Sequence, residues 1–371
     1  MDAISRGDGI GVLESLAPAE RDAFRDGVST VSDELQRLGV LNPMSLSNIP
    51  GVTVEIHDVV YHSDKLADEV VRVTMASGTI AINTRADGFP LPEHTQRWLD
   101  RDFGARVDPN SSARVIDLSR SRPSLVAVKE SGGWHVSLYY TLAEQVRGPT
   151  GGPMPRFGEG PAPVGGDTPL AASRTFIEAA ASLDAARAVT VVYPTEGRAF
   201  YDYSSLLLPL ARRHAQALAK EDLFSIDVAA LEMAESGEGT SRLVSVTSAE
   251  IKVSDGDDRL EMRYGQGCVS ERRFMSGNDR EIEESNWCDG SLAPTSRHRD
   301  PNSHIDQVTS WQDLGRAFPT FVVLERQGRW YVSPTRTVLW TFGEILHHLQ
   351  PADTDALSDR LGDLWKTYLP S

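Results

Sequence analysis

The chain contains two copies of one pattern. Residues near the N-terminus recur 176 positions later, and residues around position 130 recur 196 positions later. The two offsets differ by 20 residues, so we expect an insertion within the second copy. Self-similarity at so long a period predicts two domains of the same fold, and residues shared by both copies are expected to be scaffold. The shared residues include Asp8, Pro18, Glu20 and Phe24 with Asp184, Pro194, Glu196 and Phe200, and Val126, Gly132, Trp134 and Ser137 with Val322, Gly328, Trp330 and Ser333.

A length of 371 residues agrees with two domains, each large enough for its own core. We expect a first domain at 1–147, a linker at 148–169, a second domain at 170–349 and a C-terminal helix at 350–371. The linker contains seven Gly and six Pro, which favour irregular backbone. The first helix of copy two begins near residue 170, and its first residues would correspond to positions before Met1. We therefore expect the first helix of copy one to be truncated.

Charge and hydropathy exclude two classes of partner. The net charge of −16, from 37 basic and 53 acidic residues, opposes binding to nucleic acid, which requires clustered Lys and Arg. No run approaches the roughly 18 apolar residues of a membrane span. Any membrane anchor would therefore lie upstream of Met1.

Each copy begins with helices and continues with strands. Apolar side chains at helical spacing predict helices at 2–16 and 18–39, repeated at 170–191 and 194–219. Alternating residues from Val52 onward predict an antiparallel sheet with one buried face. The last two strands of each copy form a predicted hairpin whose turn contains Gly132 or Gly328. The predicted class is α+β, with helices packed on a curved antiparallel sheet in each domain.

The segment 2–8, the Pro-led second helix and the closing Gly-Gly-Trp-His-Val-Ser or Gly-Arg-Trp-Tyr-Val-Ser hairpin resemble the nuclear transport factor 2-like superfamily. Its members are cystatin-like α+β cones. The resemblance covers both copies, and the exported domains of bacterial envelope proteins are the most similar members. It implies a cone whose mouth can hold a small apolar ligand. Some members are isomerases, cyclases or epoxide hydrolases that place a carboxylate inside the cone.

Only two cysteines occur, Cys268 and Cys288, both near the expected insertion. No Cys-x-x-Cys or His-Cys metal spacing accompanies them, so we predict a disulfide across a hairpin or long loop rather than two unrelated thiols. A disulfide favours an extracytoplasmic location.

The best candidates for catalysis are Tyr201, Asp202 and Tyr203 on the second helix of copy two. An acid inside the cone could be tuned by burial for proton transfer. Adjacent helical positions diverge by about 100°, so Tyr201 and Asp202 are not expected to face inward together. The favoured interpretation is aromatic core residues beside a solvated Asp.

The other candidates have structural explanations. His298 and His304 stand near carboxylates, which is a composition that metals use, but flanking arginines and an Asp-Pro-Asn turn shared with copy one favour a loop. We expect Asp8 and Asp184 to cap helices, and Trp134 and Trp330 to anchor the core. Phosphate loops, nucleophile elbows and His-Glu-x-x-His motifs are absent from the sequence.

The sequence therefore favours a non-catalytic, extracytoplasmic module of the cell envelope, anchored upstream, that binds a protein partner or an apolar small molecule and uses no cofactor. Two alternatives stay open. One is an isomerase, cyclase or hydrolase that uses the cone of the second domain. The other is a rigid spacer whose two domains pair as a pseudo-dimer.

Overall fold

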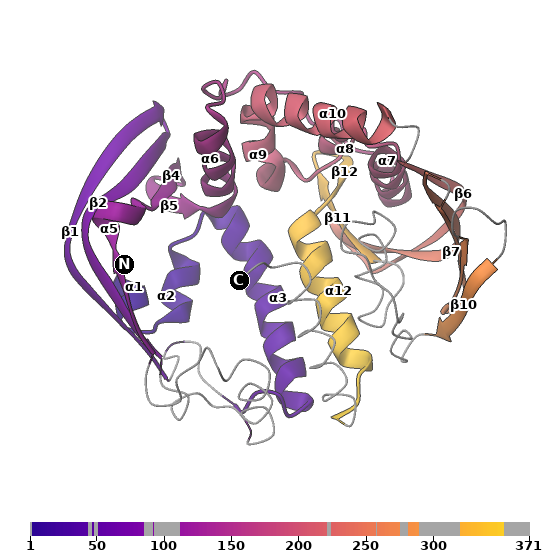
Figure 1. The fold of residues 1–371 in the computed structure, drawn as a ribbon, viewed down its shortest axis with the longest axis horizontal. Helices are drawn as coiled ribbons and strands as arrows, with labels where there is room; N and C mark the ends of the chain where they lie inside the picture. The colour runs from indigo at the N-terminus through magenta and orange to yellow at the C-terminus, as the bar shows by residue number, and fades with distance from the viewer. Residues whose placement is uncertain are drawn as a thin grey trace. The chain divides into compact units, whose positions relative to one another are not determined.

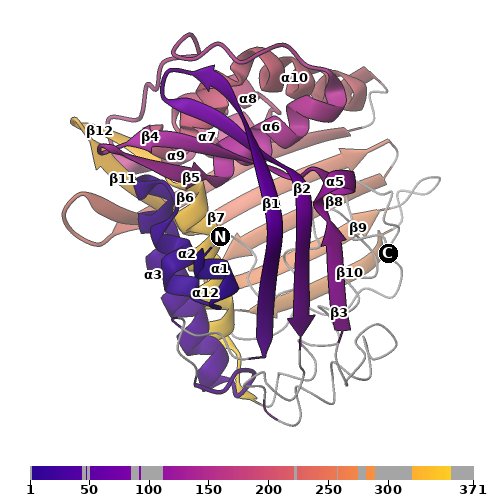
Figure 2. The ribbon, with the colours of Figure 1, turned by 90° about the vertical axis from the view of Figure 1, so that its left-hand side faces the viewer.

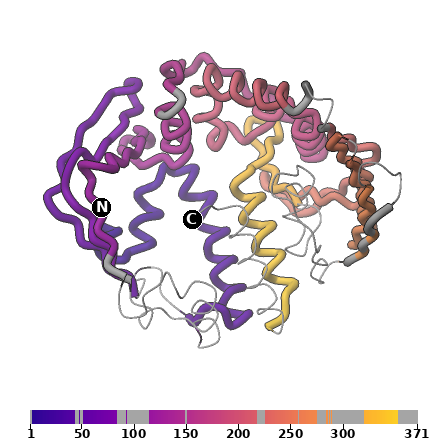
Figure 3. The backbone as a smooth tube through the Cα atoms, in the orientation of Figure 1, coloured from indigo at the N-terminus to yellow at the C-terminus, as the bar shows by residue number. Residues whose placement is uncertain are grey.

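The computed structural model describes residues 2–43, 47, 51–84, 92, 112–220, 224–256, 258–274, 281–288 and 320–351 (Figure 3). The chain divides into two compact units, Met1–Gly152 and Pro153–Ser371. Each is a layered α+β structure with helices and one antiparallel sheet, which confirms the predicted fold class (Figure 1). The predicted C-terminal helix, apart from residues 350 and 351, lies outside the described residues.

The first unit has a five-stranded sheet in the order β1-β2-β4-β5, with β3 also paired to β2. The strands β1, β2 and β3 run side by side in Figure 2. Its elements are α1 (Asp2–Ser5), α2 (Gly9–Glu14), α3 (Pro18–Arg37), β1 (Val52–Ala67), β2 (Val70–Thr84), β3 (Ser112–Asp117), α5 (Leu118–Ser121), β4 (Ser124–Glu130), β5 (Gly133–Ser137) and α6 (Leu138–Thr150).

The second unit has a seven-stranded sheet in the order β10-β9-β8-β7-β11-β12, with β6 paired to β7. Its elements are α7 (Pro169–Ala181), α8 (Ala185–Thr190), α9 (Pro194–Asp202), α10 (Ser204–Lys220), β6 (Phe224–Ser236), β7 (Ser241–Asp255), β8 (Asp258–Gly265), β9 (Cys268–Phe274), β10 (Glu281–Cys288), β11 (Thr320–Arg326), β12 (Arg329–Val332) and α12 (Pro334–His348).

The two sheets share a pairing pattern around β2 in the first unit and β7 in the second. The first half of β2 pairs with β4 and its second half with β3, just as β7 pairs first with β11 and then with β8. The position of β3 is therefore occupied by β8 in the second unit. The connections differ, because β8 follows β7 directly, whereas residues 85–111 separate β2 from β3. The strands β9 and β10 extend the second sheet beyond β8 and have no counterpart in the described part of the first.

Bulges in the first hairpin of each unit bend the sheet. The pairing of β1 with β2 shifts between His57 and Val60, and that of β6 with β7 shifts between Val228 and Ala230. An extra residue in one strand increases its twist and curvature. In the first unit the bulge faces Gly78, where a Cβ atom would lie 2.7 Å from the carbonyl oxygen of His57.

A helix follows the last strand in both units. The hydroxyl of Ser137 accepts the N–H of Tyr140, and the hydroxyl of Ser333 accepts that of Arg336. Each serine is thus an N-cap, which starts a helix. The last strand ends at Ser137 in one unit and Val332 in the other. No helix in the described part of the chain is long and apolar enough to cross a membrane.

Candidate ligand-binding site

An apolar cavity of about 180 Å³ lies between α7 and the sheet of the second unit. The helix packs against β6, β7, β11 and β12, and the rings of Phe176 and Phe321 meet edge to face with centroids 6.0 Å apart. No described lining residue carries an ionisable or polar side chain. The lining residues are Phe176, Ile177 and Ala180 from α7, Val228 and Leu231 from β6, Val246, Ala249 and Ile251 from β7, and Phe321 from β11.

Small side chains beside the bulge help to keep this cavity open. Ala249 on β7 pairs with Leu231 of β6 beside the bulge, and it is 1% exposed. Ala180 stands at the rim of the cavity, where its side chain is exposed. This pocket is open to solvent on one side, and its apolar lining favours contact with apolar molecules. The chemistry available here is therefore hydrophobic binding.

A second, larger cavity of about 490 Å³ adjoins the C-terminal end of α7. It differs from the first because polar groups from α10 and β6 share its wall with apolar ones. Its lining residues are 181–186, Leu208, Arg212, Ala215, Gln216, Ser225 and Ile226.

The two cavities are neighbours along the same helix and strand. Ala180 lines the first cavity and Ala181 the second. On β6, Val228 lines the first and Ile226 the second. Residues two apart on a strand point to the same face. Both cavities therefore lie on one face of the sheet, one after the other.

The catalytic candidates lie outside both sets of lining residues. The Tyr201 hydroxyl donates to the carbonyl oxygens of Val189 at 3.1 Å and Val192 at 3.0 Å. Burial, with a smaller contribution from Tyr331, raises the pKa of Tyr201 above its ordinary value. Tyr203 is fully buried and meets Phe157 edge to face. Both tyrosines are core residues, as the favoured interpretation expected.

Asp202 is buried rather than solvated, which corrects the sequence-based interpretation. Its side chain is covered by a segment that the sequence predicted as part of the linker, and its Oδ1 accepts the N–H of Gly158 at 2.8 Å. The Asp202 carbonyl oxygen accepts the N–H of Arg156 at 3.0 Å. Two adjacent helical residues can both be buried because the core covers one face and this segment covers the other.

Residues 153–168, which we call the strap, open the second unit and lie against its helices and last strand. Gly166 exchanges backbone hydrogen bonds with Trp330. Arg329 donates to the carbonyl oxygens of Val164 and Gly165 and pairs with Asp167. At Gly160 a Cβ atom would lie 2.0 Å from the Tyr201 carbonyl oxygen, so only glycine fits there. Residues 148–150 belong to α6.

The repeated tryptophans have different environments. Trp330 packs against the core cluster of the second unit, and the Arg242 guanidinium lies 5.6 Å from its ring centroid. Trp134 is 50% exposed, so the prediction that it anchors the core is wrong. The strap pairs with the backbone of Trp330, and the described residues of the first unit include no such segment beside Trp134.

The repeated acids and the cysteines have structural roles. Asp8 accepts the N–H of Gly11 at 2.8 Å, and Asp184 accepts that of Arg187 at 3.0 Å, which confirms both predicted caps. Cys268 and Cys288 form the predicted disulfide, which joins β9 to β10 at the open end of their hairpin.

Glu20 and Glu196 form the same buried latch in the two units. Glu20 accepts the hydroxyl of Ser137 at 2.5 Å and the N–H of Leu138 at 2.6 Å. Glu196 accepts the hydroxyl of Ser333 and the N–H of Thr335. Burial raises the pKa of Glu20, and the hydrogen bond from Ser137 opposes that shift. Each carboxylate thus ties a Pro-led helix to the start of the helix after the last strand.

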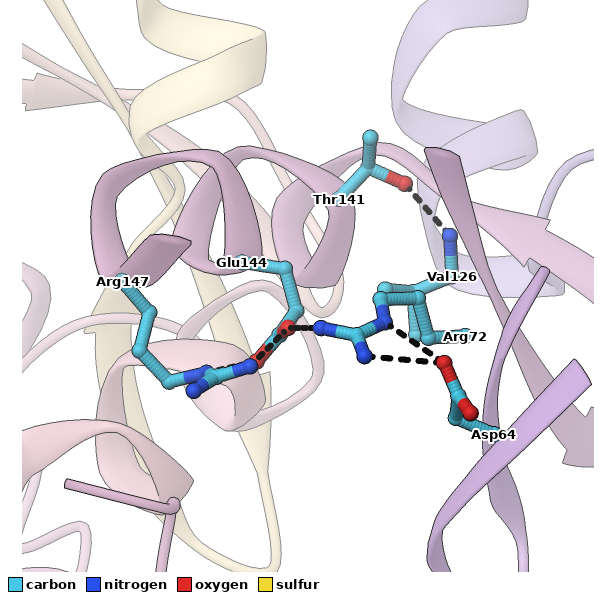
Figure 4. A network of polar contacts seen from close by, with 6 residues as sticks. All are labelled: Asp64, Arg72, Val126, Thr141, Glu144 and Arg147. Atoms are coloured by element: carbon cyan, nitrogen blue, oxygen red, sulfur yellow. Dashed lines mark hydrogen bonds and ion pairs between the residues drawn. The ribbon is translucent and has the colours of Figure 1, made fainter. Parts of the chain in front are cut away.

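An ionic network around one buried carboxylate occurs in the first unit (Figure 4). Arg72 donates to Asp64 at 2.8 Å and to Glu144 at 3.2 Å. Glu144, whose side chain is 2% exposed, also accepts two hydrogen bonds from Arg147 at 2.6 and 2.8 Å. The network joins α6 to the first two strands. Its charges compensate one another, so it is a structural anchor rather than a reactive site.

Among the described residues no cluster of His, Cys, Asp or Glu has the arrangement of a metal site. His298 and His304 lie outside those residues, so the hypothesis of a metal loop stays a prediction.

No protein-family model matches the chain, and no curated protein matches it either. Among solved structures it is similar to a chain described as an "Ntf2 like protein involved in plasmid conjugation". The two are 8% identical, the match covers 88% of this chain and 91% of that one, and the TM-score is 0.15. A superposition this poor carries no argument, and the α+β class rests on the elements described above.

Proposed function

We propose that the chain is a non-catalytic binding module built from two nuclear transport factor 2-like cones, and that its second unit binds a small apolar molecule. The observation that carries this proposal is the cavity between α7 and the sheet, whose described lining is entirely apolar. Burial of apolar ligand surface there would supply the binding free energy at about 25 cal/mol per Å². A cavity of about 180 Å³ suits a molecule the size of a single ring or a short alkyl chain.

The same cavity gives little support to the catalytic alternative. Proton transfer needs an acid or base within hydrogen-bond reach of the substrate. Asp202, the sequence candidate, accepts a backbone N–H from the strap instead, and Tyr201 donates to backbone carbonyls.

Isothermal titration calorimetry with 1-octanol as the ligand tests the proposal. We expect saturable binding with one site per chain and a negative heat-capacity change, which marks burial of apolar surface. Ala180→Phe should fill the rim of the cavity and weaken binding at least about tenfold. Val338→Phe, at an exposed position on α12, is the matched control and should change nothing. Non-saturable uptake, or equal binding by both variants, would contradict the proposal.

We infer an extracytoplasmic location from the disulfide, because such bonds persist mainly in oxidising compartments. Its sulfur atoms belong to Cys268 and Cys288, the only cysteines of the chain. Thiol labelling of intact cells that produce the protein should leave both unmodified until a reductant is added. Labelling without a reductant would place the chain in a reducing compartment and count against the envelope proposal.

A further inference from the structure

We propose that the ligand of the second unit is an amphiphile with an anionic head, and that Arg212 binds this head in the larger cavity. The inference rests on the proposed function, because the apolar part of the same molecule would occupy the smaller cavity. It adds the chemical class of the ligand and the group that selects it.

The first step is the adjacency of the two cavities. Ala180 and Ala181 are consecutive on α7, and Val228 and Ile226 share one face of β6. A chain-like molecule that spans both cavities would pass from a wholly apolar lining to one that contains polar groups. An amphiphile has the same change of polarity along its length.

The second step is the arrangement of donors on α10. Arg212 and Gln216 are four residues apart, so they lie on one face of the helix, and both line the larger cavity. Leu208, one turn earlier, lines it as well. A guanidinium offers paired N–H donors that match a carboxylate, and the Gln216 amide and the Ser225 hydroxyl can add hydrogen bonds to the same head.

The third step is the local charge. Within the described residues Arg212 makes no ion pair, and its side chain is exposed at the cavity. Asp184 also lines this cavity and carries a negative charge; its carboxylate accepts the capping N–H of Arg187, and the Arg187 guanidinium pairs with Glu178. The chain as a whole carries a net charge of −16, and Arg212 is the one cation in the described lining of this cavity, so attraction of an anionic head there depends on Arg212.

A comparison of three ligands of equal chain length tests the inference. Octanoate, 1-octanol and octylammonium are titrated into the full chain at low salt. We expect octanoate to bind best and octylammonium worst, with a difference of about tenfold or more between octanoate and the cation. Added salt should weaken octanoate binding and leave 1-octanol binding unchanged, because screening acts on charge alone.

Two single variants separate direct binding by Arg212 from the long-range effect of removing one positive charge. Arg212→Gln should weaken octanoate binding about tenfold and leave 1-octanol unaffected. Arg213→Gln removes the same charge from the next residue, which does not line the cavity, and should alter neither. Circular dichroism should show both variants folded, since both side chains are exposed.

The outcomes distinguish this inference from the proposed function. If 1-octanol binds in a manner that depends on Ala180 but octanoate binds no better, the anionic head is wrong and the apolar site stands. If Arg212→Gln and Arg213→Gln weaken octanoate equally, the effect is long-range and the assignment to Arg212 fails. If none of the three ligands saturates, the proposed function itself is wrong.

Discussion

At the helix after the last strand, charged positions of the first unit correspond to uncharged positions of the second. Val126 and Val322 are equivalent in the repeat. Arg72 is the partner of Val126 on β2 and Leu243 is the partner of Val322 on β7, so Arg72 corresponds to Leu243. At the repeat offset of 196, Glu144 and Arg147 correspond to Trp340 and Gly343. The polar contact at the helix start is kept, since Thr141 and Thr337 each accept a strand N–H at 2.9 Å. The same fold therefore accepts an ion-paired set of residues at these positions in one unit and Leu, Trp and Gly in the other, and the charged set is accepted because its charges are paired.

The largest effect should come from breaking the charged anchor. Glu144→Ala leaves two arginines without their buried partner, and we expect the first unit to lose about 3–5 kcal/mol of unfolding free energy. Hydrogen exchange of α6 amides measures this locally. Replacing Arg72, Glu144 and Arg147 together by Leu should cost less than the single variant, because the second unit is apolar at the first two positions. A triple variant less stable than Glu144→Ala would show that charge itself is required.

The next effect should be confined to the second unit. Cys268 and Cys288 are 20 residues apart, and a cross-link of this length stabilises by about 3 kcal/mol because it restricts the unfolded chain. We expect the Cys268→Ser/Cys288→Ser variant to lower the denaturant midpoint of the second unit by the corresponding amount. Hydrogen exchange in β4 and β5 serves as the internal control and should not change. Equal loosening of both units would indicate that they unfold together.

The smallest effect concerns the latch in the first unit and depends on pH. Glu20→Ala should destabilise by about 2 kcal/mol below about pH 4 and by less at pH 7, since Ser137 and Leu138 lose their acceptor. The pKa of Glu20 is raised in the folded state, so its contribution to stability is fully present below its unfolded pKa near 4.5 and is lost as pH rises through the folded pKa.

Glu20→Gln removes the charge and keeps one of the two acceptor oxygens. We therefore expect the stability of this variant relative to the parent to rise between about pH 4 and pH 7, because only the parent has an ionisable group at this position. Urea midpoints at the two pH values measure it. A Gln variant that is less stable than the parent at pH 7 alone would mean that the ionised carboxylate is favoured by its surroundings.

The repeat was sufficient to predict much of the fold. Periodicity and turn residues identified the α+β class, the Pro-led helices and the closing hairpin, because these depend on local sequence. The caps at Asp8 and Asp184 and the disulfide also followed from residue type and spacing. The helix at Leu138–Thr150 was missed, although Ser137 stands at a position typical of an N-cap.

The sequence by itself determined the number of units, their class and the residues of their common scaffold, because these depend on patterns repeated along the chain. Tertiary structure alone decided which side chains are buried. The strap buries Asp202 and pairs with Trp330, whereas Trp134 stays exposed. Only the fold brings Ala180, Ile226 and Arg212 to the two neighbouring cavities. Contacts between distant segments depend on how the helices pack on the sheet, and they leave no periodic pattern in the sequence.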